Sequence, residues 1–545
     1  MGRIPHGDSN ICQRPANITT VLLGEYRIDG FVADSGVANY LGVPYAEIPA
    51  RFRQARRIQS SKLKGTYDAT RYGPICPQNV DVPRKWRDHL YQGIVTSDAL
   101  SASEFECLNL NIYAPIERAG QPLPVFVWVH GGGWVVGDGG PEYDGNFLVQ
   151  HSSKLGLPFI YVALNYRLGY FGFSYSKELR AEAVAAGEVP FANVGLHDQR
   201  LALMWVQGNI HHFGGDASNV TIAGESAGAW SVLAHLRSNV PLFRRAMIMS
   251  APSLAPQGAE GAQRDFDSLL AVSGLDATAS DRQKLDWLRN LSVDSLLKVS
   301  PPSLIFPIWD PEWFSHEDSS LPLDKIGDFP NWCDGIIVGW TKDETALFGM
   351  VRGWNLWSID MIRNAIRLAI PDMSLADEVL RVYNIINTPQ DVKSALKGLI
   401  QFTSDGSFGS LMESMRSYTA TPISIYRFDQ VDPFEHSPFL GYAYHALDNA
   451  FICRLPAVAG AEAPKQLRIT ADAYTKSVCE FVHGRQPWVS SGSSQKIQSF
   501  NGFLTGLVEW TGFPQWNALA TTADHAAMLK RGARALMSMK AEQLC

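Results

Sequence analysis

A serine lies between two glycines in the stretch TIAGESAGAW. The apolar run before it, residues 220–223, predicts a buried strand, and residues 226–237 predict a helix that begins at the serine. A sharp turn from a strand into a helix lifts the residue at the turn above the carboxyl edge of a sheet, and glycines suit a turn with no room for Cβ atoms. Ser226 is therefore a candidate nucleophile, although so short a G-x-S-x-G pattern also arises by chance.

A second glycine-rich stretch, VHGGGWVVGDGG at residues 129–140, follows the end of another apolar run. Three consecutive glycines leave backbone N–H groups unshielded, so these groups can converge on the negatively charged oxygen formed during acyl transfer. A phosphate-binding loop is excluded, because Asp138 stands where such a loop requires lysine. Together the two stretches favour acyl transfer by a nucleophilic serine over a pair of ordinary flexible turns.

The elements that must position these residues form an alternating pattern of strands and helices. Short apolar runs predict strands that are buried on both faces, as in a parallel sheet. These runs lie at 124–130, 159–166, 220–223, 246–249 and 336–340, with helical stretches at 193–210 and 226–237. We predict an α/β protein with a central, mostly parallel sheet flanked by helices.

The division of the chain follows from the same pattern. Three long stretches, 77–106, 251–335 and 345–440, lack a clear strand rhythm. We expect them to be insertions that roof the site, the first as a loop and the other two as mainly helical segments. A single catalytic domain over residues 1–545 is therefore the preferred division.

Composition and charge exclude several kinds of partner. The 545 residues include 47 Lys plus Arg against 54 Asp plus Glu, a formal charge of −7, and no basic run could grip phosphates. We therefore expect no nucleic-acid partner. The longest apolar runs are far shorter than the roughly 18 residues that a membrane span requires.

The first residues, MGRIPHGDSNIC, contain no apolar core of a secretory signal. We therefore expect a cytoplasmic protein, and secretion is the alternative if the N-terminus is incomplete. The sequence carries no indication of the oligomeric state.

The most specific block of the chain is NVGLHDQRLALMWVQGNIHHFGGDASNVTIAGESAGAWS, residues 193–231. With CLNLNIYAP at 107–115, ALNYRLGYFGF at 163–173 and FRRAMIMS at 243–250, it resembles the type-B carboxylesterase and cholinesterase family, in particular its fungal esterase and lipase members. The resemblance covers most of the chain. It implies the α/β-hydrolase fold, in which nucleophile, acid and histidine follow one another along the chain.

The resemblance also implies the partners that a serine hydroxyl needs, a histidine that accepts its proton and a carboxylate that orients the histidine. In GWTKDETALF the family pattern G-x-x-x-D-E places the acid at Glu344, with Asp343 as the alternative. Thr345 then stands where the family usually has glycine. In YAYHALDNAFIC the family pattern H-x-x-D/E-x-x-x-F places the histidine at His445, with His436 as the alternative.

Further roles come from the resemblance alone. It assigns the oxyanion hole to the backbone N–H groups of Gly132, Gly133 and Ala227. Glu225 matches a buried glutamate beside the nucleophile, where it either tunes the field of the site or acts as a structural hydrogen-bond acceptor. Trp134 directly follows the glycine loop, where it is poised to wall an acyl pocket.

Phe306 precedes the acid at a distance comparable to that of acyl-pocket aromatics in the family. For this residue and for Trp134, a core or surface role is at least as plausible on sequence. Cys76 and Cys107 match paired cysteines around an omega loop, and the resemblance implies a disulfide between them, although in a reducing cytosol they would stay free. The loop contains PRKWRDHLY rather than a long apolar face, so hydrolysis of soluble esters is favoured over action on lipid droplets.

We therefore expect a serine carboxylic-ester hydrolase whose partner is a small-molecule ester and whose mechanism needs neither a cofactor nor a metal. Two alternatives stay open. One is acyl transfer or lactone formation, in which an alcohol replaces water at the acyl-enzyme. The other is a non-catalytic binding module, which the presence of all the candidate residues disfavours.

Overall fold

The structure, a computed structural model, describes most of the chain. The described residues are 15, 17–59, 62, 64–79, 85–91, 99–117, 120–275, 278–299, 306–314, 320–385, 391–418, 420–488, 495–540 and 543. The first fourteen residues, on which the expectation of a cytoplasmic protein rests, lie outside this set. So do residues 80–84 and 92–98 of the stretch that we expected to form a loop over the site.

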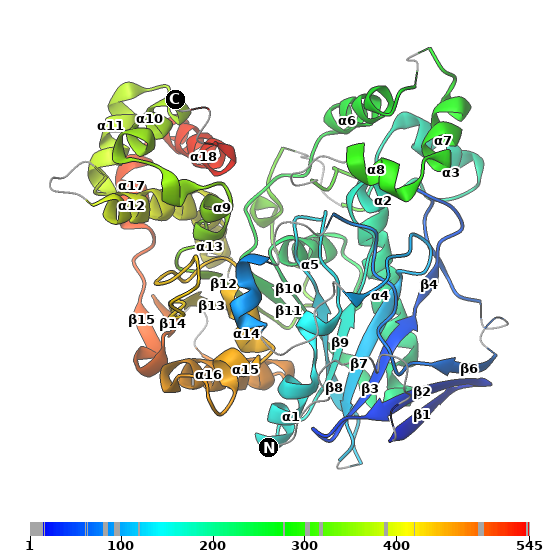
Figure 1. Ribbon diagram of the computed structural model, residues 1–545. Helices are drawn as coiled ribbons and strands as arrows, with labels where there is room; N and C mark the ends of the chain where they lie inside the picture. The colour runs from blue at the N-terminus through cyan, green and yellow to red at the C-terminus, as the bar shows by residue number, and fades with distance from the viewer. Residues whose placement is uncertain are drawn as a thin grey trace.

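A mixed sheet of 13 strands crosses the described part of the molecule (Figure 1). Its order is β1-β2-β3-β7-β9-β8-β10-β11-β12-β13-β14-β15, and β6 pairs with β2. The strands are β1 (Ile18–Leu23), β2 (Tyr26–Val32), β3 (Val37–Pro44), β6 (Gly65–Asp68), β7 (Asn109–Pro115), β8 (Leu123–Val129), β9 (Ile160–Leu164), β10 (Gly215–Glu225), β11 (Arg245–Met249), β12 (Gly335–Thr341), β13 (Ile423–Phe428), β14 (Lys496–Phe500) and β15 (Gly506–Glu509). A separate small sheet pairs β4 (Ala46–Glu47) with β5 (Arg56–Arg57).

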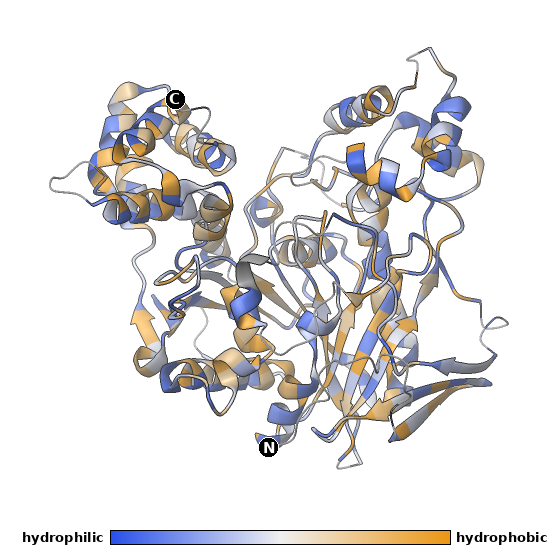
Figure 2. Cartoon of the chain, in the orientation of Figure 1, coloured by the Kyte–Doolittle hydropathy of each residue, from blue (hydrophilic) through white to orange (hydrophobic). Residues whose placement is uncertain are grey.

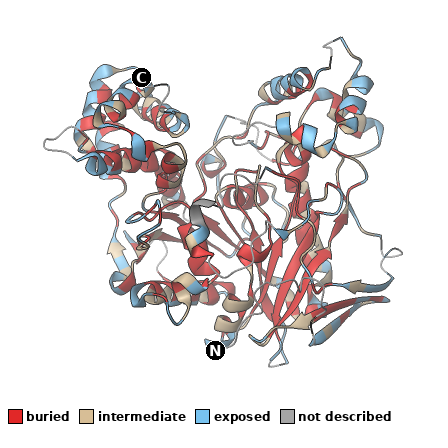
Figure 3. Cartoon of the chain, in the orientation of Figure 1, coloured by how far each residue is buried: buried red, intermediate tan, exposed pale blue. Residues whose placement is uncertain are grey.

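The five predicted strands are confirmed as β8 to β12, which are neighbours in one parallel block. Their unbroken apolar sequences fit strands that other elements cover on both faces, and every residue of β8, β9, β11 and β12 is buried. Figure 3 shows this buried centre, and Figure 2 shows hydrophobic residues along the same strands. The predicted α/β class, with a central sheet flanked by helices, is therefore confirmed.

Strands at both sides of this block are missing from the sequence prediction. Strand β7 is buried throughout but carries Asn109 and Asn111, whose side-chain amides donate to the carbonyls of Pro74 and Gly139. Buried asparagines break the apolar run by which such a strand is recognised. Strand β13 lies inside the stretch 345–440, which was expected to be an insertion, so that expectation is wrong at this strand.

Helices fill the connections between the strands. In chain order they are α1 (Asn146–Lys154), α2 (Gly169–Phe173), α3 (Lys177–Ala185), α4 (Val194–Asn209), α5 (Ala227–Arg237), α6 (Ala259–Val272), α7 (Asp281–Asn290), α8 (Val293–Val299), α9 (Ala346–Val351), α10 (Ile359–Ala369), α11 (Met373–Val382), α12 (Val392–Ser404), α13 (Ser410–Ser417), α14 (Leu447–Ile452), α15 (Pro456–Ala459), α16 (Lys465–Val482), α17 (Pro514–Leu519) and α18 (Ala523–Ser538). Helix α5 packs on β8, β10 and β11, and α16 packs on β8 and β14. In Figure 1, α6 to α8 gather with α3 at one end, while α18 joins α10 and α12 at the other.

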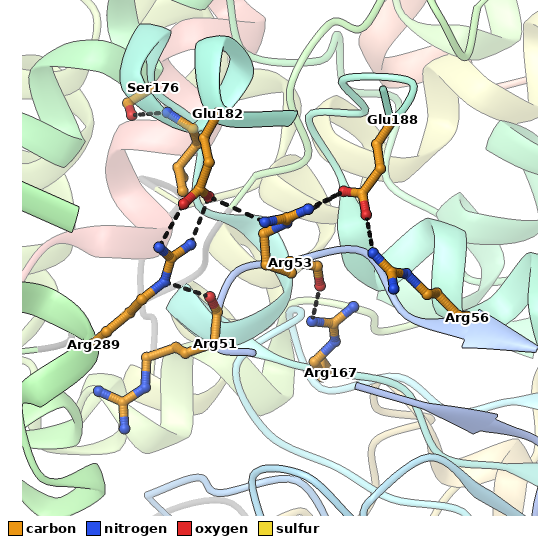
Figure 4. A network of polar contacts seen from close by, with 9 residues as sticks. Arg51, Arg53, Arg56, Arg167, Ser176, Glu182, Glu188 and Arg289 are labelled. Carbon is orange, nitrogen blue, oxygen red and sulfur yellow. Dashed lines mark hydrogen bonds and ion pairs between the residues drawn. The ribbon is translucent and has the colours of Figure 1, made fainter. Parts of the chain in front are cut away.

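Ion pairs attach the helices α3 and α7 to the N-terminal part of the chain (Figure 4). Arg289 on α7 forms two bonds of 2.6 Å to the carboxylate of Glu182 on α3. Nη2 of Arg53 lies 2.8 Å from Oε2 of Glu188, a residue just after α3. The backbone carbonyl of Arg53 accepts a 2.6 Å hydrogen bond from the guanidinium of Arg167, which follows β9. Bidentate arginine contacts are geometrically specific, so this network fixes the two helices against the sheet.

Gly228, the second glycine of the G-x-S-x-G stretch, lies where the first turn of α5 packs against the end of β8, and a substitution there tests how tight this contact is. A Cβ atom here would overlap the carbonyl oxygen of Val129 and lie 2.7 Å from that of His130. We expect Gly228→Ala to lower the free energy of unfolding by about 1–3 kcal/mol in a denaturant titration. Gly208→Ala is the matched control, because Gly208 is also helical and has open space around its Cβ position, so it should gain about 0.5–1 kcal/mol. Equal effects of the two substitutions would contradict the proposed crowding.

Candidate active site

Four loops meet at the carboxyl edge of the parallel block. The glycine loop follows β8, Ser226 follows β10, and Glu344 follows β12. His445 lies in the loop between β13 and α14. Because these strands are parallel and close in the sheet, their carboxyl ends place the four loops side by side (Figure 1).

Ser226 lies at the sharp turn between β10 and α5. Its backbone has φ 56° and ψ −120°, a conformation that L residues rarely adopt and that costs about 1–3 kcal/mol. The turn is held from both sides: the N–H of Ser226 donates to the carbonyl of Met249 at 2.9 Å, and its carbonyl accepts from Trp230 at 3.0 Å. The side chain is half-buried, as a nucleophile raised above the sheet edge should be.

The glycine loop lies directly against this turn. A Cβ atom on Gly131 would lie 3.2 Å from Cβ of Ser226 and 2.7 Å from the carbonyl oxygen of Glu225. Gly132 and Gly133 both have positive φ angles, 104° and 61°. Ala227 is the first residue of α5, so its N–H is one of those that a helix leaves without an internal partner. Gly131, which directly precedes Gly132 and Gly133, and Ala227, which directly follows Ser226, thus bring the segments assigned to the oxyanion hole next to the serine.

The structure brings Glu344 and His445 together in a buried contact. Nδ1 of His445 lies 2.5 Å from Oε2 of Glu344. The other carboxylate oxygen of Glu344 accepts the N–H of Thr341 at 2.9 Å. Glu344 is thus fixed at both oxygens, and the imidazole is fixed through one nitrogen.

Asp343, the alternative acid, has a different contact. Its carboxylate accepts the N–H of Ala443 at 2.9 Å, and its own N–H donates to the carbonyl of Ala443 at 2.8 Å. Burial raises the pKa of this carboxyl group above its usual value. Asp343 therefore joins the acid loop to the histidine loop. His436, the alternative histidine, is exposed.

Thr345, which stands where the family usually has glycine, is accommodated by α12. Its hydroxyl group contacts the hydroxyl of Thr403 at 2.6 Å and donates to the carbonyl of Ile400 at 3.0 Å. Its N–H donates to the hydroxyl of Ser404 at 3.1 Å. A buried threonine is satisfied here by hydrogen bonds, so the acid loop keeps its place without glycine.

A second carboxylate reaches the other nitrogen of the imidazole. Oε1 of Glu225 lies 3.0 Å from Nε2 of His445, and Nδ2 of Asn449 donates to Oε2 of Glu225 at 3.4 Å. Burial lowers the pKa of His445, but the negative charges of Glu225 and Glu344 oppose it more strongly and raise the pKa to about 9. Both carboxylates therefore favour the protonated form of the imidazole in this arrangement.

Asp448 is a third buried carboxyl group beside the histidine. The hydroxyl of Tyr426 donates to it at 3.0 Å. Burial, together with the charges of Glu225 and Glu344, raises the pKa of Asp448 to about 7. The sequence motif contains this residue, but its burial against two other acids could not be derived from the motif.

Two phenyl rings that the sequence analysis did not identify lie against the imidazole. The ring centroid of Phe348 is 5.0 Å from that of His445, and the centroid of Phe408 is 5.5 Å away. Phe348 follows Glu344 by four residues on α9, a helical spacing that could have indicated it. Phe408 belongs to the π-helical turn Asp405–Gly409, for which the sequence carries no recognised signal.

The sequence pattern of the carboxylesterase family matches residues 19–531. The chain belongs to the carboxylesterase family. It is 35% identical to lipase 5 of Diutina rugosa over 343 residues, which span 57% of this chain and 59% of the lipase. It is 30% identical to the para-nitrobenzyl esterase of Bacillus subtilis over 438 residues, which span 77% of this chain and 80% of that protein. Acetylcholinesterase of Danio rerio is 34% identical over 330 residues, 58% of this chain and 49% of that protein.

The two aromatic residues that we expected at an acyl pocket lie together. The ring centroids of Trp134 and Phe306 are 6.4 Å apart. Trp134 is buried and also packs edge-on against Trp230 at 5.4 Å, whereas Phe306 is partly exposed. Trp134 is thus part of the core beneath the glycine loop, and Phe306 covers it from the solvent side.

The disulfide that the family resemblance implied is not formed. Cys76 and Cys107 are buried free thiols that contact each other. The hydrogen bond of the Cys107 thiol to Cys76, followed by burial, raises the pKa of Cys107 well above its usual value. The thiol of Cys76 also accepts the N–H of Leu168 at 3.2 Å. Packing and hydrogen bonds, not a cross-link, hold the described ends of this loop.

Within the described ranges, no cluster of three or more His, Cys, Asp or Glu side chains has the arrangement of a metal site. Among the same residues, no helix has the length and apolarity needed to cross a bilayer.

The charge of Glu225 should be measurable in the titration of His445. Glu225→Gln removes one of the two charges that hold the imidazolium, so we expect the pKa of His445 to fall by about one to three pH units. The ring resonances of the histidine, followed by NMR across pH 5–11, report this directly. Asp343→Asn is the control, because that carboxylate is directed to Ala443, and it should leave the titration unchanged. Identical titrations of Glu225→Gln and wild type would show that Glu225 does not act on the histidine.

Proposed function

We propose that this chain hydrolyses carboxylic esters through Ser226, His445 and Glu344. The observation that carries the proposal is the 2.5 Å contact between His445 and Glu344, at the same sheet edge as the strained turn of Ser226. A buried imidazole with a carboxylate at Nδ1 and a serine nearby is the arrangement that activates a hydroxyl group. Membership of the carboxylesterase family supports the same reaction.

In the proposed reaction, Nε2 of neutral His445 accepts the hydroxyl proton of Ser226 while the serine oxygen bonds to the ester carbonyl carbon. The backbone N–H groups of Gly132, Gly133 and Ala227 stabilise the oxyanion. The intermediate then collapses, and the leaving alcohol takes the proton from Nε2. Water repeats the sequence: it gives a proton to the same nitrogen, attacks the acyl carbon and releases Ser226 with that proton.

Glu225 gives this reaction a distinctive acid–base balance. The charges of Glu225 and Glu344 favour the imidazolium that forms after each proton transfer. The same charges raise the pKa of the resting His445 to about 9, so the neutral base becomes more abundant as the pH rises. Ester hydrolysis at low substrate concentration should therefore increase through the alkaline range.

The proposed substrate is an ester whose acyl group lies against Phe306. This partly exposed ring packs on the buried Trp134 and offers an apolar surface that suits a hydrocarbon chain. The names of two relatives, acetylcholinesterase and para-nitrobenzyl esterase, are those of ester-cleaving proteins. We propose the same reaction class here, on small soluble esters.

The nucleophile is tested with nitrophenyl esters of increasing acyl length. Ser226→Ala should lower the turnover number about 10⁴-fold or more, because the acyl-enzyme cannot form. Ser250→Ala is the matched control, since Ser250 also follows a parallel strand and also has a positive φ angle, 53°. That variant should keep turnover within a few-fold. Unchanged turnover in Ser226→Ala would remove the proposed mechanism.

The acid is tested by neutralising each member of the Asp-Glu pair. Glu344→Gln places an amide against Nδ1 of His445 and should lower turnover about 10⁴-fold, as loss of the orienting carboxylate does in serine hydrolases. Asp343→Asn keeps an oxygen that accepts the N–H of Ala443 and should change turnover only a few-fold. The reverse order of effects would identify Asp343 as the acid.

A further inference from the structure

Gln78 joins the chain just after Cys76 to the glycine loop. Its amide oxygen accepts the N–H of Gly137 at 2.7 Å, and its amide nitrogen donates to the carbonyl of Gly137 at 2.9 Å. The same nitrogen also donates to the carbonyl of Cys76 at 3.1 Å. One buried side chain thus satisfies both backbone groups of a single glycine.

Gly137 in turn closes the glycine loop on itself. It has φ 110°, and a Cβ atom there would lie 2.5 Å from the carbonyl oxygen of Gly131 and 2.5 Å from Nδ1 of His130. Between the two ends, the carbonyl of Gly132 accepts the N–H groups of Val135 and Val136, both at 3.1 Å. Residues 131–137 of the loop therefore form a compact turn in which Gly131 and Gly137 lie against each other.

The first glycine of this turn lies against the nucleophile. Gly131 has its Cβ position 3.2 Å from Cβ of Ser226, and the next two residues carry the N–H groups assigned to the oxyanion hole. A shift of Gly137 is transmitted through Gly131 to these groups, because the contacts leave no free space. Oxyanion stabilisation depends on donors that are already in place, and small displacements reduce it strongly.

Two asparagines hold the loop at Gly139. The N–H of Gly139 donates to Oδ1 of Asn165 at 2.7 Å, and its carbonyl accepts from Asn111 at 2.8 Å. One asparagine lies on β7 and the other directly follows β9. Gln78, from the segment after Cys76, holds the loop two residues earlier, at Gly137. Without it, two backbone groups of Gly137 lose their partners where little water can replace them.

We propose that Gln78 is a positioning residue for the oxyanion hole, holding the glycine loop at the geometry that the transition state requires. The proposal rests on the function proposed above and extends it to a residue outside the catalytic loops. Under this proposal, the first residues of the stretch 77–106 influence the rate of the reaction.

The test compares ground-state binding with transition-state binding. Gln78→Met keeps the length and bulk of the side chain without its amide, and Gln78→Ala removes both. We expect each to lower kcat about tenfold or more and to change KM less than twofold. A trifluoromethyl ketone, which forms a tetrahedral adduct with the serine, should bind more weakly by about the same factor as kcat.

Gln207→Ala is the control variant. It removes another glutamine whose side chain forms hydrogen bonds with backbone groups. Nε2 of Gln207 donates to the carbonyls of Ala217 and Leu242, both at 2.8 Å, at a place away from the glycine loop. This variant should lower the unfolding temperature and leave kcat and inhibitor affinity unchanged. If the Gln78 variants behave in the same way, with lower stability and unchanged kcat, the proposal is overturned.

The outcome also separates this proposal from the proposed function. If the wild-type chain does not hydrolyse the esters, or if Ser226→Ala hydrolyses them equally well, the function itself fails. If the wild type is active, Ser226→Ala is inactive and the Gln78 variants keep full kcat, only the role of Gln78 fails. Should Gln78→Ala not fold, Gln78→Met carries the same comparison.

Discussion

The register between β12 and β13 is the constraint on which the site depends. The two strands pair in parallel from Ile336 opposite Ile423 to Thr341 opposite Phe428. Beyond their ends, a bridge between Asp343 and Tyr444 continues the pairing to the residues that directly precede Glu344 and His445. A slip of one residue would turn each side chain to the other face of the sheet and separate Glu344 from His445. Asp343 therefore helps to position the imidazole without touching it.

The sequence reveals the parts of this arrangement whose signal is local. Strands β8 to β12 are continuous apolar runs, and Ser226, Glu344 and His445 lie in short motifs. It does not reveal β7, because Asn109 and Asn111 interrupt the apolar pattern for the sake of hydrogen bonds to loops. Gln78 carries no local signal at all, since its partner Gly137 lies 59 residues further along the chain. Thr345 stands where the family usually has glycine, and the sequence does not show how it is accommodated. Its hydrogen-bond partners on α12 come near it only in the folded chain.

Electrostatics link these separate segments into one unit. Glu225, Glu344 and Asp448 come from three different segments, yet all three surround the imidazole of His445 in a place with little water. Ionisation of all three beside a single imidazolium would leave a net charge of −2 in the interior, which is unfavourable without further partners. The raised pKa values of Asp448, about 7, and of His445, about 9, are two responses to the same crowding: both retain protons that reduce the negative charge.

The imidazole of His445 is surrounded by aromatic rings as well as by carboxyl groups. Phe348 and Phe408 flank the ring, and they limit the access of water to a contact whose strength depends on low polarity. Next to Ser226, the three consecutive glycines of the glycine loop have no side chains with which to exclude water or to fix themselves. Residues outside the loop help to set its geometry: Asn111 and Asn165 bind Gly139, and Gln78 binds Gly137. Each half of the site is therefore held by segments that take no direct part in the chemistry, as a preorganised site requires.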